Sequence, residues 1–242
     1  MTTPENSDAK GFLATHWTVI MAAARGSDTS RAAAALTQMC RTYWYPLYAY
    51  LRRRGHDSHG AEDLTQAFFA SLLARDFLAN IDPRKGKFRS FLLASLKHFL
   101  SDERDRASAQ KRGGGRPIIS LDGLDAEARY QLEPAHDLSP EKMFEKQWAL
   151  SLLELVLSRL QAESVAAAKQ ALFEVLQPAL TGGQGCRYAD MARDLGMTEA
   201  AIKTAVHRLR RRYRTLLIEE IAQTVAEPDD VDSEIRYLMS CL

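Results

Sequence analysis

The hydrophobic positions of the chain recur with the spacing of an α-helix over most of its length. Apolar residues fall at i, i+3, i+4 and i+7, and few segments alternate with a period of two. The pattern therefore predicts an all-α protein. The expected helices are 15–24, 30–54, 61–75, 88–107, 140–159, 164–180, 188–195, 198–224 and 232–240.

The helical pattern stops at residues 108–139, which are rich in glycine, proline and charged residues. This composition predicts a linker that is partly disordered or lies extended on a partner. The glycines beside Lys111 and Arg112 lack the Gly-Lys-Ser/Thr sequence of a phosphate-binding loop. The expected organisation is an N-terminal extension (1–30), a first helical domain (31–112), the linker (113–140), a second helical domain (141–218) and an acidic C-terminal extension (219–242).

The net charge of +1 hides an uneven distribution along the chain. Residues 84–112 hold nine Lys or Arg against three acids, and residues 200–218 hold six basic residues and no acid. Residues 121–145 and 219–242 are acidic, with seven acids each. Two separated basic segments predict two surfaces that contact a polyanion. The acidic tail carries the charge opposite to the second basic segment, which suggests a regulatory role for it.

The second basic segment belongs to a predicted helix-turn-helix. Gly196 can end the helix 188–195 in the left-handed conformation, and Thr198 can cap the next helix, with Glu199 in its first turn. A buried stripe is expected at Ile202, Val206, Leu209, Tyr213 and Leu216. The remaining face would place Glu199, Ala200, Lys203, Thr204, His207, Arg208 and Arg211 toward DNA.

Two further helices carry the chemistry of the first domain. GAEDLTQAFFASLL turns Leu64 and Phe68 inward and leaves a polar, acidic patch at residues 62–66. The next helix interleaves aromatic and basic residues, which suits single-stranded nucleic acid. The aromatic stretch TYWYPLYAYLRRR (42–54) is expected to place Tyr43, Trp44, Leu47, Tyr50 and Leu51 in the core, and a base-stacking role for one of its rings stays open.

These motifs resemble the extracytoplasmic-function (ECF) sigma factors of bacterial RNA polymerase. GAEDLTQAFFASLL looks like the region-two helix that binds the polymerase clamp, and FRSFLLASLKHFLSDERDR looks like the following helix, which captures the melted −10 element. YADMARDLGMTEAAIKTAVHRLRRRY looks like the region-four helix-turn-helix that reads the −35 element. The resemblance covers residues 36–112 and 145–215, in an extended form with additions at both ends.

The resemblance implies roles residue by residue. It places core-polymerase contacts at Glu62, Asp63, Leu64, Gln66 and Phe68, and −10 contacts at Arg89, Lys97, His98, Ser101 and Arg104. The −35 contacts would be the DNA-facing residues listed above. His98 replaces the family's usual Asn, Ser90-Phe91 replaces Ala-Trp, and Ala205 stands where Arg is common. The implied partners are promoter DNA and the beta and beta-prime subunits of the polymerase core, with an anti-sigma factor or a Ser/Thr kinase as candidate regulators.

The sequence also allows interpretations from other classes of function. A stand-alone helix-turn-helix regulator that dimerises through its N-terminal helices is the alternative, and an enzyme is a distant third. HDSHGAED (56–63) could form a metal cluster, but a polar loop that caps a helix is the stronger interpretation. Cys40, Cys186 and Cys241 lack metal-ligand spacing. We expect no cofactor, metal, membrane span or catalysis, and a cytoplasmic location.

Overall fold

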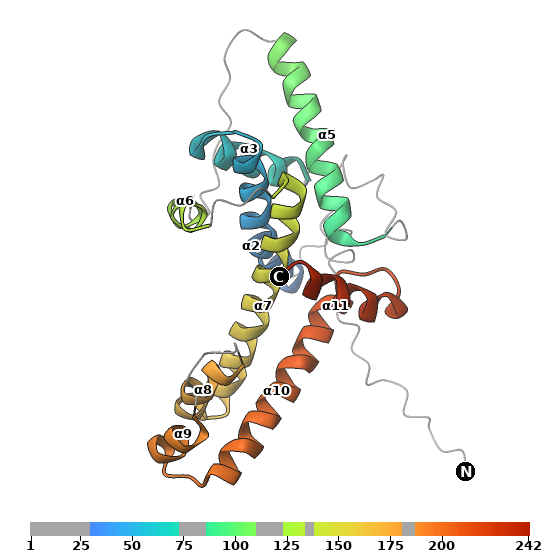
Figure 1. Ribbon diagram of the computed structural model, residues 1–242. Helices are drawn as coiled ribbons and strands as arrows, with labels where there is room; N and C mark the ends of the chain where they lie inside the picture. Colours follow the sequence, from blue (N-terminus) through green and yellow to red (C-terminus); the bar gives the residue numbers. More distant parts are fainter. Residues whose placement is uncertain (1–29, 73–85, 110–122, 134–137, 181–186) are drawn as a thin grey trace, which may run out of the picture.

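The computed structural model describes residues 30–72, 86–109, 123–133, 138–180 and 187–242, and every regular element in these ranges is a helix (Figure 1). The prediction of an all-α fold is confirmed. The predicted helix 15–24 lies outside the described residues. The molecule is elongated, with α5 (Phe88–Ala109) at one end and the α9–α10 turn at the other (Figure 1).

Three helices of the first domain pack through aromatic side chains. α2 (Ser30–Arg53) lies against α3 (Ser58–Leu72), where Trp44 and Phe69 stack with ring centroids 5.9 Å apart. Tyr43 meets Phe88 of α5 edge to face at 5.3 Å. Every side chain from Thr42 to Leu51 is buried, so the prediction that this stretch forms core is confirmed, and its rings are closed to a base.

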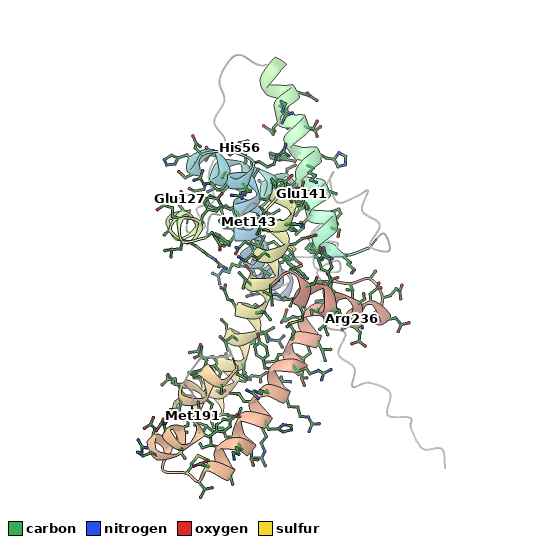
Figure 2. The ribbon with its side chains drawn as sticks, viewed as in Figure 1. His56, Glu127, Glu141, Met143, Met191 and Arg236 are labelled. Carbon is green, nitrogen blue, oxygen red and sulfur yellow. The ribbon has the colours of Figure 1, made fainter. Side chains whose placement is uncertain are left out.

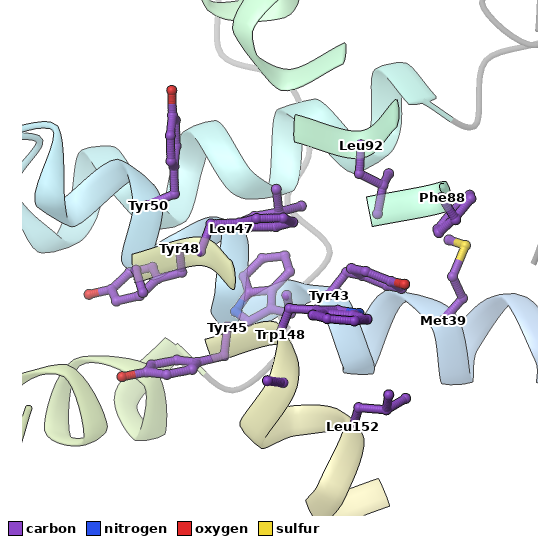
Figure 3. Packing of buried hydrophobic residues seen from close by; sticks show 14 of the residues in the cluster. Met39, Tyr43, Tyr45, Leu47, Tyr48, Tyr50, Phe88, Leu92, Trp148 and Leu152 are labelled. Atoms are coloured by element: carbon purple, nitrogen blue, oxygen red, sulfur yellow. The ribbon is translucent and has the colours of Figure 1, made fainter. Parts of the chain in front are cut away.

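The long helix α7 (Pro140–Ala166) packs most extensively against α2. Its start is well specified, because Pro140 fits the first turn and the Ser139 side chain accepts a hydrogen bond from the Lys142 backbone N–H. Trp148 is fully buried among the aromatic and aliphatic side chains of α2 (Figure 3). The main core therefore continues from the first predicted domain into the second, and the functional division between them stays a prediction.

The helix-turn-helix has a small core of its own. α8 (Gln170–Leu176), a 3₁₀ turn (Gln177–Ala179), α9 (Tyr188–Leu195) and α10 (Glu199–Ala222) enclose it. Its buried residues are Leu176, Ala179, Met191, Ala192, Ile202 and Val206. Gly196 adopts φ 62°, and Thr198 accepts a hydrogen bond from the Ala201 N–H at 3.2 Å. The predicted glycine turn and threonine cap are confirmed.

Two expectations about the helices are wrong. α7 runs on through the predicted break at 160–163, and the next helix begins at Gln170 instead of residue 164. The second error concerns the predicted linker, where Gly123–Gln131 form the helix α6 instead of an extended segment. A helix of nine residues is marginal in isolation, so tertiary contacts must hold it.

Those contacts centre on one carboxylate of α6. Glu127 accepts hydrogen bonds from Arg52 Nε at 2.9 Å and Arg52 Nη2 at 3.0 Å, and the Tyr48 hydroxyl also donates to it. These contacts dock α6 on α2 (Figure 2). The hydrogen bonds from Tyr48 and Arg52 outweigh the cost of desolvation and lower the pKa of Glu127.

The C-terminal extension is also helical. After a 3₁₀ turn (Pro228–Asp230), α11 (Val231–Ser240) folds back across the C-terminal end of α10 and contacts α7, close to the start of α5 (Figure 1). The predicted helix 232–240 is confirmed. Among the described helices, none is both long and apolar enough to cross a bilayer.

Candidate nucleic-acid and partner-binding surfaces

One face of α10 presents polar and basic side chains to solvent. Its buried stripe holds Ile202, Val206 and Leu216, with Leu209 and Tyr213 half buried. The seven residues predicted to face DNA are all exposed and lie together on the opposite face: Glu199, Ala200, Lys203, Thr204, His207, Arg208 and Arg211. Lys203, Arg208 and Arg211 form no ion pair with any residue in the described part of the chain. Their charges are therefore available to an anion.

Two other arginines of α10 serve the fold. Arg212 donates to Glu163 of α7 at 2.8 Å and 2.5 Å, and to Glu219 at 3.3 Å. Arg210 donates to the Ala179 carbonyl at 2.8 Å. The hydrogen bond with Glu163 raises the pKa of Arg212, and the same bond lowers the pKa of Glu163. Both arginines belong to the basic segment 200–218 that was predicted to contact a polyanion, because charge alone does not reveal a partner far along the chain.

The middle of α5 forms a second exposed polar face. Lys97, His98, Ser101 and Arg104 are all exposed and fall within two turns of the helix. Lys97 is held by Glu141 of α7, with Nζ 2.8 Å from Oε1, and this hydrogen bond raises the pKa of Lys97. Because both side chains remain nearly half exposed, a phosphate could exchange for the carboxylate at small cost.

Arg89 lies apart from these four residues. Its side chain is buried, and its Nε donates to the Glu234 carboxylate of α11 at 2.6 Å. Burial alone would lower the pKa of Arg89, but the hydrogen bond and charge of Glu234 outweigh it, and the pKa is raised. An arginine in this setting cannot reach a DNA strand while α11 is docked.

The acidic patch of α3 is partly exposed. Asp63 is exposed, and Glu62, Leu64 and Gln66 are half buried, with Gln66 Nε2 donating to Glu62 at 3.4 Å. Phe68 is buried against Phe99 of α5, with ring centroids 5.8 Å apart. Asp63 therefore offers the most accessible charge of the predicted contact set, while Phe68 supports the helix from beneath.

The loop before α3 behaves as a helix start. Asp57 Oδ1 accepts a hydrogen bond from the Gly60 N–H at 2.7 Å, which confirms the capping interpretation. Burial, helped by the charge of Arg54, lowers the pKa of His56. Within the described ranges, no three His, Cys, Asp or Glu side chains gather closely enough to hold a metal ion.

α11 lies at the C-terminal end of α10, away from the N-terminal half of that helix (Figure 1), and the regulatory role that the tail's charge suggested stays a prediction. The fully buried carboxylate of α11, Glu234, pairs with Lys87 and Arg89 at the start of α5, and Glu220, also buried, pairs with Arg159 of α7. The polar face of α5 and the N-terminal half of α10 lie at opposite ends of the molecule (Figure 1). Each predicted residue set occupies its own helix, and the fold does not gather the sets into one pocket.

Residues 40–110 match the family model described as Sigma-70 region 2. The match begins within α2 and includes all of α3 and α5. This match supports the interpretation that the chain is a member of the sigma-70 family with a general role in promoter recognition by RNA polymerase. No curated protein and no solved structure matches the chain.

Proposed function

We propose that the protein is a sigma factor of the ECF kind, in an extended form, which directs core RNA polymerase to specific promoters. One observation carries the proposal: the segment that matches sigma-70 region 2 precedes a helix-turn-helix with a free basic face. A helix-turn-helix alone is common to many regulators. Its combination with region 2 in one chain is what favours promoter recognition.

The −10 role is assigned to the exposed face of α5. Lys97 and Arg104 would pair with phosphates, while His98 and Ser101 would donate or accept hydrogen bonds at unstacked bases. Extruding a base costs on the order of a few kcal/mol. The protein would supply this free energy by binding and would perform no chemistry itself. Arg89 contributes indirectly, by fixing the start of α5.

The −35 role is assigned to the exposed face of α10. Residues near a recognition helix's N-terminus reach base edges, and cations farther along meet phosphates. Ala200, Lys203 and Thr204 are therefore assigned to the major groove, and Arg208 and Arg211 to the backbone. Glu199 lies in the first turn, where its negative charge interacts favourably with the helix dipole. Its carboxylate can also accept a hydrogen bond from the amino group of cytosine.

The polymerase contact is assigned to the exposed edge of α3. Asp63 projects into solvent from the middle of the matched segment. A carboxylate on a partner surface mainly sets orientation and association rate. Leu64 adds a half-buried apolar contact beside it.

Transcription in vitro tests the proposal. Core polymerase with and without the chain is given random double-stranded DNA fragments, and RNA start sites are mapped by sequencing. We expect start sites preceded by shared sequence elements only when the chain is present. A His98→Ala, Arg104→Ala double variant should lose these transcripts on duplex DNA and regain them on a template already melted at the −10 element.

The matched control is Ser90→Ala, which alters an exposed residue of the same helix outside the proposed contact set. It should keep the parental start sites. Sequence-specific duplex binding by the chain alone, without any polymerase-dependent transcript, would contradict the proposal and favour the stand-alone regulator.

A further inference from the structure

We propose that α7, α10 and α11 form a rigid brace that holds the α10 reading face at a fixed separation from the polar face of α5. The identity of the two ligands rests on the proposed function, but the brace itself does not. The folded chain alone would then fix the distance between the two surfaces that bind a promoter's two elements, before any partner binds. The brace consists of two long helices and one docked helix that locks them.

The first part of the brace is α7, which is continuous over 27 residues. At about 1.5 Å per residue the helix spans about 40 Å. Its N-terminal half is embedded in the main core through Met143, Trp148 and Leu152. Its C-terminal half leads directly to α8, which packs on α9 of the helix-turn-helix. One unbroken helix therefore runs from the main core to the turn at residues 167–169 that precedes α8.

The second part is α10, which runs beside α7 and is tied to it (Figure 1). Arg159 of α7 pairs with both Glu219, at 3.0 Å, and Glu220. Arg212 of α10 pairs with Glu163 in the opposite direction. Leu216 lies between the ion-pairing residues of α10 and Ile221 follows them, and both are buried in the main core, so the two helices are joined by apolar packing as well as charge. These ties join residues 153–163 of α7 to residues 212–220 of α10, and two helices joined in this way resist bending there better than either alone.

The third part is α11, which locks the end of α10 to the start of α5. Glu234 is fully buried and accepts from Lys87 Nζ and from Arg89 Nε, each at 2.6 Å. The guanidinium of Arg89 lies 4.0 Å from the ring centre of Tyr237 and 5.1 Å from that of Trp148. The Phe88 N–H donates to the Thr224 carbonyl at 2.9 Å. Elements from α5, α7, α10 and α11 meet at this one cluster.

The cluster is part of the hydrophobic core, so α11 is not a surface helix that detaches easily. Leu238 of α11 and Phe88 of α5 are fully buried in the same hydrophobic cluster. Lifting α11 away would expose Leu238 to water and leave Arg89 with only its longer pair to Glu145, at 3.5 Å. Arg89 and Glu234 are therefore positioning residues: they set where the α5 face stands relative to α10.

A distance measurement tests the brace in the full chain. Spin labels are attached at Ala94→Cys on α5 and Ala189→Cys on α9, both exposed positions outside the proposed contact sets. The natural cysteines Cys40, Cys186 and Cys241 are first replaced by serine or alanine. We expect pulsed electron paramagnetic resonance to give a single narrow distance distribution for the parent. A broad or multiple distribution would overturn the proposal.

Variants of α11 test the lock. Glu234→Gln should broaden the distribution at least twofold, and Asp232→Asn, which removes the same charge from an exposed site of the same helix, should leave it unchanged. A Glu234→Gln distribution as narrow as the parent's would refute the lock. If that variant does not fold, Glu234→Asp replaces it, because it retains the charge and should still widen the distribution.

The outcome is separable from that of the proposed function. A narrow distance in a chain that supports no transcription would contradict the sigma assignment and leave the brace intact. A broad distance in a chain that does direct polymerase to promoters would contradict the brace alone.

Discussion

The two basic helices, α5 and α10, use their charges in different ways. On α5, Arg89 is buried and satisfied by an acid 145 positions away, Glu234. On α10, Arg208 and Arg211 stand in solvent with no described ionic partner, although Arg212 beside them is bound by Glu163. The comparison teaches that a cation's role depends on the carboxylate that folding brings to it. A count of basic residues therefore cannot tell how many of them pair with acids of the same chain and how many are available to an external anion.

The largest effect should come from the buried charge of α5. Removing the carboxylate in Glu234→Ala leaves the buried Arg89 with only its longer pair to Glu145, at 3.5 Å, and breaking a buried pair costs about 3–5 kcal/mol. Denaturant unfolding should therefore show a large loss of stability. Asp232→Ala, on the exposed side of α11, should change it by about 0.5 kcal/mol or less. A loss below about 1 kcal/mol for Glu234→Ala would erase the proposed difference between the two helices.

A smaller effect is expected where α10 meets DNA. Arg211→Ala should weaken binding to its duplex site by about 1.5–3 kcal/mol, as for a hydrogen bond to a charged group. It should also reduce the slope of log affinity against log salt by about 1. Arg212→Ala, whose charge is held by Glu163, should leave that slope unchanged. Equal salt slopes for the two variants would show that the ion pair does not decide which arginine meets phosphate.

The turn between α9 and α10 should respond to a backbone change. Gly196 has φ 62° and open space around it, so Gly196→Ala meets no clash, and its cost of about 1–2 kcal/mol comes from the left-handed conformation alone. Ala168 occupies the same region, with φ 55°. Ala168→Gly should therefore act in the opposite direction and stabilise slightly. Thermal unfolding that shifts both variants the same way would contradict this explanation.

The smallest effect concerns acid pH. The hydrogen bond from Arg212 lowers the pKa of Glu163 below its ordinary 4.5. A carboxylate with a depressed pKa stabilises the fold above 4.5 and loses that contribution as the pH falls through the lower, folded-state pKa. Because this pair is partly exposed, the contribution should be within about 1 kcal/mol. Unfolding followed from pH 6 to pH 3 should be less pH-dependent in Glu163→Gln than in the parent.

Local sequence signals predicted much of the fold. Apolar spacing located most helices, and Gly196 and Thr198 identified the helix-turn-helix through their own backbone requirements. The helix α6 was missed because Glu127 gains its partners, Tyr48 and Arg52, from 75 or more positions away.

The candidate surfaces were predictable from the sequence where they depend on local helical spacing alone. Helical spacing placed Lys97, His98 and Arg104 on one exposed face of α5. It could not separate Arg89 from them, because the acid that buries it lies in a different helix. For Phe68, helical spacing correctly predicted an inward side chain, whereas the resemblance placed it in the polymerase contact set. For Arg89, the missing information was its long-range pairing with Glu234.

Binding to bacterial core RNA polymerase tests the sigma assignment most directly. The purified chain is titrated against core enzyme beside two charge-reversal variants, Asp63→Arg on α3 and Asp229→Arg, an exposed acid outside every proposed contact set. We predict tight binding by the parent and by Asp229→Arg, and a loss of at least tenfold, or about 1.4 kcal/mol, for Asp63→Arg. Absence of binding by a folded parent chain would contradict the assignment.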